Sequence, residues 1–133
     1  MTEGGVTALE RSLSLLGPLE GRIMREVWTG SVPEPFVVRD VQTRMPELAY
    51  TTVMTTVNRL ADKGLLDVQP IKGQRAHVYR LATSPEVFLE RASREQVERV
   101  VERFGDAAMA AFAERLNRLS PEQLRRLKEL RRS

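Results

Sequence analysis

The sequence predicts a mainly α-helical chain that carries one small β-hairpin. Three observations lead to this fold class. Apolar residues recur at helical spacing through several segments that proline and glycine separate. One stretch, residues 65–81, combines apolar residues of strand type with a glycine-containing tip, which is typical of a hairpin. This hairpin follows two helices that a very short connection joins, and that order predicts a winged helix-turn-helix.

The composition is that of a globular chain of 133 residues, of which 41% are hydrophobic and 29% are charged. This length suits one domain or two very small ones. The net charge of +3 permits binding to nucleic acid but does not require it. The chain has no cysteine, which excludes disulfides and thiolate metal sites. No run approaches the roughly 18 apolar residues of a membrane span, so we expect a cytoplasmic protein without membrane insertion.

The chain is expected to open with a flexible leader over residues 1–16, with at most a helical turn at 8–15. A first stable helix is expected over residues 17–29, because Pro18 suits the first helical position. The apolar stripe of this helix consists of Leu19, Ile23, Val27 and Trp28. Trp28 is expected to fill the core rather than to bind a ligand.

A helix-turn-helix is expected next, since its two helices are joined by only a few residues. The first helix begins at Arg39 or Asp40 and runs through Met45, where Pro46 stops it. The second helix lies within residues 48–66, whose sequence is LAYTTVMTTVNRLADKGLL. A basic last turn and a glycine are expected to end it.

The second of these helices has an apolar face and a polar face. Its apolar residues lie within about 40° of one another at 100° per residue. They are Val53, Val57 and Leu60. The polar face is the predicted DNA-binding surface, because hydroxyl, amide and guanidinium groups can reach base edges and phosphates. Its residues are Thr51, Thr52, Thr55, Asn58 and Arg59. Four threonines at positions 51, 52, 55 and 56 are hard to explain as inert surface, because β-branched side chains lose rotamer freedom in helices.

The residues of this face are expected to contact different parts of the duplex. The threonines would contact bases, through a hydroxyl group or through a methyl group against thymine. Asn58 could bridge an adenine, but its position past the middle of the helix favours a phosphate or a sugar. Arg59 could reach a guanine or a phosphate, and the phosphate is favoured.

The hairpin is expected to project a basic tip beside this helix. The tip, residues 71–75, contains Lys72 and Arg75 and no acid, and Gly73 is free to adopt positive φ. The two basic residues are expected to bind phosphates and so to add salt-dependent affinity rather than sequence choice. Residues 36–38 could add one edge strand to the hairpin.

Three amphipathic helices are expected from residue 83 onward. Two helix-start signals, Ser84-Pro85-Glu86 and Ser120-Pro121-Glu122, each combine a cap, a proline and an acid. The pair Gly105-Asp106 separates the first of these helices from the second. Together they carry more apolar surface than they can bury alone, which marks a partner surface. The predicted dimerisation residues are Val97, Val101, Phe104, Met109, Phe112, Leu116, Leu124 and Leu127. The expected partner is a second copy of the chain, since symmetric operators need two-fold proteins.

In their order, these segments resemble the penicillinase repressor family, also called the BlaI/MecI family. The resemblance rests on LGPLEGRIMREVW at 16–28, VRDVQTRM at 38–45, the stretch at 48–66, HVYRL at 77–81 and RFGDAAMAAFAERLNRLSPEQLRRL at 103–127. It implies a homodimeric transcriptional repressor. A winged helix-turn-helix domain over residues 17–82 would bind double-stranded DNA at inverted repeats in promoters, and a helical domain over residues 83–133 would dimerise.

The resemblance also implies how such a repressor is released. Several family members leave the DNA when a membrane-bound sensor protease acts and the dimerisation region is cut between an asparagine and a phenylalanine. The matching positions here are Ala111 and Phe112, so the phenylalanine is kept and the asparagine is replaced. The copper-responsive branch of the family carries a cysteine cluster, which this chain lacks.

Two other classes of function are less consistent with the sequence. A winged helix that binds only protein is the main alternative, but it has no need of a basic tip without acids. An enzyme is not expected, because the sole histidine, His77, lies in a strand and the chain has no glycine-rich phosphate loop or nucleophile elbow. We therefore expect no cofactor and no bound metal.

Overall fold

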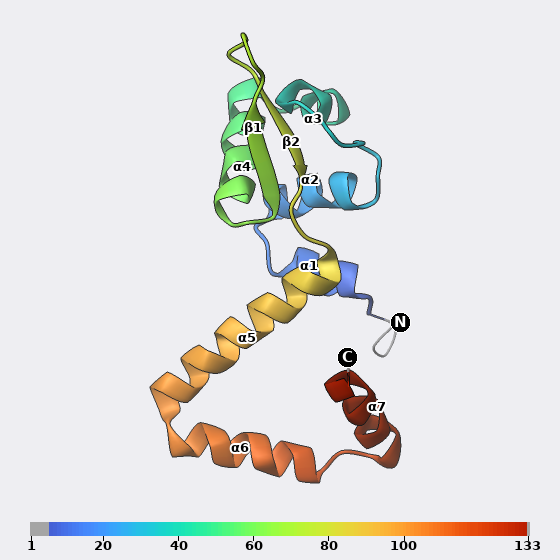
Figure 1. Ribbon diagram of the computed structural model, residues 1–133, viewed down its shortest axis with the longest axis vertical. Coiled ribbons are helices and arrows are strands. Elements are labelled where there is room, and N and C mark those ends of the chain that lie inside the picture. The colour runs from blue at the N-terminus through green and yellow to red at the C-terminus, as the bar shows by residue number, and fades with distance from the viewer. Residues whose placement is uncertain (1–5, 133) are drawn as a thin grey trace. The chain divides into compact units, whose positions relative to one another are not determined.

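The computed structural model describes residues 6–132, and the side chains of residues 6–131. Within these residues the elements in chain order are α1 (Ala8–Ser14), α2 (Pro18–Trp28), α3 (Val38–Arg44), α4 (Tyr50–Asp62), β1 (Leu66–Pro70), β2 (His77–Leu81), α5 (Pro85–Phe104), α6 (Asp106–Asn117) and α7 (Pro121–Arg132) (Figure 1). The strands form one antiparallel two-stranded sheet. This confirms the predicted fold class, mainly helical with a hairpin wing. The chain divides into two compact units, of which the first ends at Arg91 and the second begins at Ala92.

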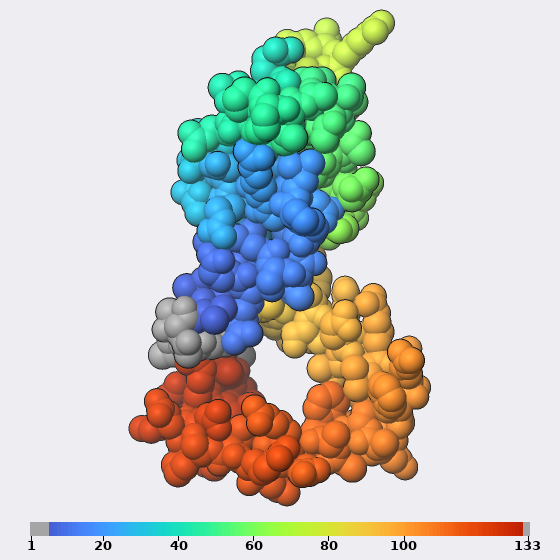
Figure 2. Space-filling model, turned by 180° about the vertical axis from the view of Figure 1, so that it is seen from behind, coloured from blue at the N-terminus to red at the C-terminus, as the bar shows by residue number. Residues whose placement is uncertain are grey.

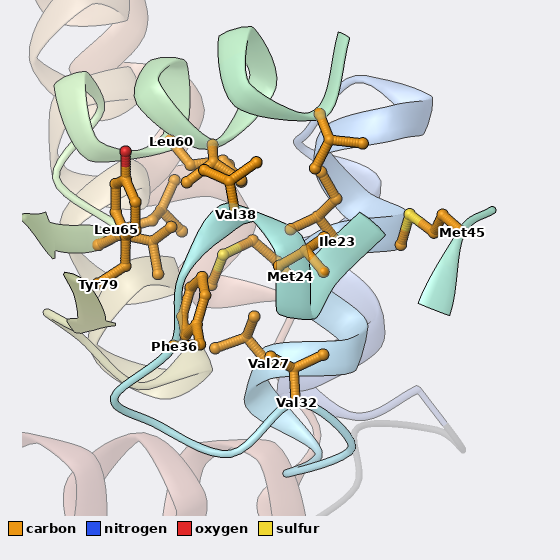
Figure 3. Packing of buried hydrophobic residues seen from close by; sticks show 14 residues of the cluster. Ile23, Met24, Val27, Val32, Phe36, Val38, Met45, Leu60, Leu65 and Tyr79 are labelled. Carbon is orange, nitrogen blue, oxygen red and sulfur yellow. The ribbon is translucent and has the colours of Figure 1, made fainter. Parts of the chain in front are cut away.

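The first unit is built around one apolar core that α2, α3, α4 and the hairpin share (Figure 3). The apolar face predicted for α4 is confirmed, since Val53, Val57 and Leu60 are all 0% exposed. Helix α2 contributes Ile23 and Met24, which are also fully buried. Side chains of this size stabilise the fold by roughly 1.5–3 kcal/mol each when they leave water. The core therefore holds α4 with its opposite face turned outward.

Helix α2 begins as predicted, with Gly17 as its N-cap and Pro18 in the first turn. At the other end, Trp28 packs against the core and its indole N–H donates a hydrogen bond to the carbonyl of Thr83 at 2.9 Å. The Trp28 ring also lies 6.0 Å from the ring of Phe88, between centroids. The tryptophan thus joins α2 to the first turns of α5, and the structural role expected for it is confirmed.

The helix-turn-helix consists of α3 and α4, but α3 begins earlier than predicted. It starts at Val38 rather than at Arg39 or Asp40. The reason is a local hydrogen bond, in which the backbone N–H of Val37 donates to the Asp40 carboxylate at 2.9 Å. An acid in this third position satisfies a donor that the helix itself leaves unpaired. Helix α4 ends at Asp62 with Lys63 as its C-cap, and the next residue, Gly64, has a φ of 81°, the left-handed conformation that glycine favours.

The hairpin pairs β1 with β2 from Leu66 opposite Leu81 to Pro70 opposite His77. Pro70 is the last residue of β1 in a sheet that has only two strands, so its missing N–H removes no bond from a central ladder. Gly73 at the tip has a φ of 78°, as the sequence led us to expect. The edge strand considered for residues 36–38 is reduced to an isolated antiparallel bridge between Phe36 and Tyr79.

The N-terminal segment differs from the flexible leader expected over residues 1–16. Residues 1–5 lie outside the described part, but Ala8–Ser14 form helix α1. Thr7 caps this helix by accepting a hydrogen bond from the N–H of Glu10 at 3.1 Å. The buried hydroxyl of Ser12 donates to the carbonyl of Pro85 at 2.9 Å. This bond and the Trp28 contacts place the start of α5 in the first unit, so that unit extends beyond the boundary predicted at residues 82 and 83.

The second unit contains the remainder of α5, with α6 and α7. Gly105, with a φ of 58°, separates α5 from α6. Ser120 starts α7 by a reciprocal pair of hydrogen bonds, since its hydroxyl accepts from the N–H of Gln123 at 3.1 Å and its own N–H donates to the Gln123 side chain at 3.0 Å. No helix in the described part of the chain is long and apolar enough to cross a membrane.

Candidate nucleic-acid interface

The outward face of α4 presents the polar residues that the sequence singled out. Thr51, Thr52, Thr55, Asn58 and Arg59 are all exposed. The first turn of this helix carries no acid, and its N-cap Ala49 makes no side-chain hydrogen bond to it. The N–H groups at this end therefore keep the partial positive charge that suits an anion.

One threonine does not belong to this face. Thr56 is buried, and its hydroxyl donates a hydrogen bond to the carbonyl of Thr52 at 2.8 Å. Its polar group is therefore satisfied inside its own helix, as is common for threonine in helices. Thr56 therefore cannot count among the surface threonines, contrary to what the sequence led us to expect, and three exposed threonines remain on this face.

The wing carries the basic tip expected for it. Lys72 and Arg75 are exposed, and the tip projects beyond the rest of the first unit (Figures 1 and 2). Arg80 differs, because it lies opposite Asp67 across the two strands, where a carboxylate offsets its charge. The positive charge of the wing is thus concentrated at its end.

A groove of about 370 Å³ runs between α4 and the hairpin. Its lining residues are Val37, Val38, Tyr50, Met54, Asn58, Val68, Arg75, Ala76, His77 and Tyr79. No aspartate or glutamate is among them, so an anion entering the groove would meet no like charge. The structure thereby brings together Asn58 from the helix and Arg75 from the wing.

Nothing in the sequence indicated that Tyr79 and Arg39 contribute to this surface. Tyr79 donates a hydrogen bond from its hydroxyl to Asn58 Oδ1 at 2.7 Å. Burial raises the pKa of Tyr79, and the electrostatic effect of the nearby Tyr50 raises it further, so its hydroxyl stays protonated at neutral pH. The guanidinium of Arg39 lies 5.6 Å from the centroid of the Tyr50 ring, a cation–π contact at the N-terminus of α4. The sequence places Tyr79 in the returning strand of the hairpin, but only the fold shows which polar group its hydroxyl meets.

A buried carboxylate ties the far end of α4 to α2. Glu20 is 5% exposed and accepts hydrogen bonds from Lys63 Nζ at 2.9 Å and from the N–H of Gly17 at 3.1 Å. Burial raises the pKa of Glu20, but these two hydrogen bonds and the charges of Lys63 and Arg59 outweigh it, so the pKa lies below its usual value. This contact stabilises the orientation of α4 at its C-terminal end.

The predicted dimerisation residues all lie in the second unit. Val97, Phe104, Met109, Phe112, Leu116 and Leu124 are exposed, and Val101 and Leu127 are half-buried. The pair Ala111-Phe112, which matches the position of the cut in relatives, lies in the middle of α6. A protease would have to unwind this helix locally to reach the peptide bond. Within the described residues, no group of three or more His, Cys, Asp or Glu side chains is placed to hold a metal ion.

Comparison with known proteins identifies the family. Residues 16–132 match the family model described as penicillinase repressor. Two curated proteins from Mycobacterium tuberculosis strains CDC 1551 / Oshkosh and ATCC 25618 / H37Rv, each named Transcriptional regulator BlaI, are 44% identical over 70 residues. The match covers 50% of this chain and 48% of each relative, so the chain spans about half the length of the curated relatives it matches.

The similarity to solved structures is weaker. The transcriptional regulator PA4135 is 18% identical with a TM-score of 0.44, over 83% of this chain and 82% of that one. A mutant of MarR from E. coli, solved in complex with operator DNA, is 12% identical with a TM-score of 0.45, over 94% and 81% of the two chains. The family model, in contrast, matches nearly the whole sequence from residue 16 to residue 132, and the chain therefore belongs to the penicillinase repressor family.

Proposed function

We propose that this protein is a cytoplasmic transcriptional repressor that binds an inverted-repeat promoter operator as a homodimer. The observation that carries the proposal is the outward face of α4, whose N-terminal half presents uncharged hydroxyl groups. The opposite face of the same helix is buried in the core, so the orientation of the outward face is fixed. A solvated helix surface would have no need of three exposed threonines. The family match supports the same function, as does the name of the BlaI relatives.

Each group on this surface has a role in the proposal. Thr51, Thr52 and Thr55 enter the major groove and contact base edges. Arg59 binds a phosphate beside them, and Lys72 and Arg75 bind phosphates from the wing, where their contribution weakens as salt is added. No catalytic residue is part of the proposal.

The second unit supplies the partner surface. In the described part of this unit, seven large apolar side chains are exposed on its helices, which is more than a self-sufficient monomer of this size would leave in water. A second copy of the chain can cover these side chains and place two α4 helices on one duplex. Release by a membrane sensor protease is the induction route that the family suggests, with Ala111-Phe112 as the candidate site of the cut.

DNA binding tests this proposal directly. The wild-type chain should bind a duplex taken from the promoter region of its own gene, in a complex that weakens as salt is raised. The double variant Thr55→Ala, Arg75→Ala should bind it at least roughly tenfold more weakly, because it loses one base contact and one phosphate contact per protomer. The matched control is Thr29→Ala with Arg118→Ala, which removes the same chemical groups from exposed positions outside the proposed surface.

Equal binding by the wild type and the Thr55, Arg75 variant would rule out this surface as the DNA interface. A wild-type chain that binds no duplex at low salt would favour the alternative, a winged helix that binds protein alone.

A further inference from the structure

Tyr79 is one of the most firmly held side chains in the first unit. It is 2% exposed, and its ring stacks on Phe36 with centroids 5.7 Å apart. The backbones of these two residues also exchange both hydrogen bonds, with N–O distances of 3.0 Å and 2.8 Å. Figure 3 shows the ring beside Phe36 with its hydroxyl pointing toward α4. The position of this hydroxyl is therefore set by the core and not by solvent.

The hydroxyl of Tyr79 orients an exposed residue on the recognition helix. It donates to Asn58 Oδ1 at 2.7 Å, a short hydrogen bond between β2 and α4. Since one end of the amide is anchored in this way, its Nδ2 end points away from Tyr79 with two N–H donors. Reading an adenine requires a donor and an acceptor from the same amide, and the anchored side is the acceptor side.

The surroundings of Asn58 favour a phosphate over a base. Asn58 lines the groove together with Arg75 and His77, and the groove contains no carboxylate. A phosphodiester offers only acceptors, which match the two N–H groups of the amide and the guanidinium of Arg75. The apolar lining from Met54 and Val68 is suited to the deoxyribose that accompanies the phosphate.

We propose that Tyr79 is a positioning residue, which holds Asn58 as a hydrogen-bond donor to a DNA phosphate lying between α4 and the wing. The inference rests on the proposed DNA-binding function and goes further, because it joins the wing and the recognition helix into one phosphate site. It also separates Asn58 from the threonines, which contact bases. The contribution of Asn58 is then independent of the base sequence.

A double-mutant cycle tests this site, with two DNA probes. Tyr79→Phe, Asn58→Ala and the double variant are titrated by fluorescence anisotropy against the promoter duplex and a random-sequence duplex. Each single variant should weaken binding to both probes by roughly fivefold, the effect of about one hydrogen bond. The double variant should bind no more weakly than Asn58→Ala alone, because Tyr79 acts through Asn58. Thr29→Val, which removes a hydroxyl elsewhere, should bind as the wild type does.

A further variant separates positioning from structural support. Asn58→Asp keeps the oxygen that accepts from Tyr79, but it replaces the donors with negative charge. Its melting temperature should match that of the wild type, whereas its DNA binding should be weaker than that of Asn58→Ala. A merely structural role for the pair would instead leave Asn58→Asp binding as well as the wild type does.

Four further results would overturn the inference. Additive effects in the cycle would show that Tyr79 does not act through Asn58, and a loss confined to the promoter duplex would assign Asn58 to a base. Unchanged binding by both single variants would show that Tyr79 and Asn58 form no phosphate site, while leaving the proposed function intact. A wild-type chain that binds neither duplex would overturn the proposed function itself and this inference with it.

Discussion

Replacing Glu20 by glutamine should remove a pH-dependent part of the stability of the first unit. The carboxylate of Glu20 accepts two hydrogen bonds, from the N–H of Gly17 at the start of α2 and from Lys63 at the end of α4. Its other oxygen, Oε2, is buried and makes no hydrogen bond within the described part of the chain. The substitution keeps the shape of the side chain and exchanges the charged carboxylate for a neutral amide.

The sign of the effect follows from the pKa of Glu20, which lies below its usual value of 4.5. A depressed pKa in the folded state means that the ionised carboxylate stabilises the fold above the unfolded pKa, and that this stability is lost as the pH falls through the folded pKa. A hydrogen bond to a charged group contributes about 1 kcal/mol more than a neutral one. Glu20 accepts two such bonds, but Lys63 is half exposed and its bond counts for less, so the loss at pH 7 is about 1–2 kcal/mol.

Urea unfolding measures this loss, with tryptophan fluorescence as the signal. The chain has one tryptophan, Trp28, and it packs against the core of the first unit. At neutral pH, Glu20→Gln should lower the free energy of unfolding by about 1–2 kcal/mol, and the difference between the two proteins should shrink as the pH falls below the usual Glu pKa. The matched control is Glu10→Gln, which breaks an ion pair with Arg25 at 3.0 Å whose two side chains are half exposed. Its effect should be smaller because water screens that pair.

A deficit of the same size at pH 7 and pH 3 would refute this reasoning, since it would assign the effect to packing rather than to charge. An equal effect from Glu10→Gln would refute the importance of burial.

Two other predictions concern the end of α4 and the second unit. Gly64→Ala should destabilise the first unit by about 1–2 kcal/mol, because its φ of 81° is unfavourable for residues with a Cβ. An added Cβ would not clash, because its nearest atom would be Arg91 Nη1 at 3.5 Å, an ordinary contact. Since asparagine tolerates the left-handed conformation better than alanine does, Gly64→Asn should recover part of the lost stability in the same urea assay. An asparagine variant less stable than the alanine variant would contradict this. Phe112→Glu should weaken self-association in sedimentation equilibrium by at least roughly tenfold, since two apolar rings leave the proposed dimer interface. Arg118→Glu is the control. If both variants self-associate as strongly as the wild type does, Phe112 is not part of that interface.

The fold was largely predictable where local signals and apolar periodicity agree. The α4 stripe placed Val53, Val57 and Leu60 inward, and all three are fully buried. Proline after a capping residue located the starts of α5 and α7, where the side chains of Ser84 and Ser120 each accept a backbone N–H at 3.1 Å. These features depend on residues within one or two helical turns, so the sequence contains the necessary information.

Features that depend on distant contacts were not predictable in the same way. Helix α1 is held by Ser12, a polar residue whose hydrogen-bond partner lies 73 residues away. Thr56 and Tyr79 show the same limit at the candidate site. A helical wheel cannot show that the hydroxyl of Thr56 is satisfied by its own backbone, nor that the hydroxyl of Tyr79 meets Asn58. The list of surface residues was therefore easier to predict than the role of each one.

The two units make sense together under the proposed function. One copy of the α4 face and wing offers three cations, Arg59, Lys72 and Arg75, beside neutral threonines. Since much of the affinity for DNA comes from phosphate neutralisation, this set alone would bind weakly at physiological salt. A second copy on the same duplex doubles the phosphate contacts and binds at a high effective concentration. In this proposal the exposed apolar residues of the second unit hold that copy, so separating the protomers would release the DNA, whatever signal separates them.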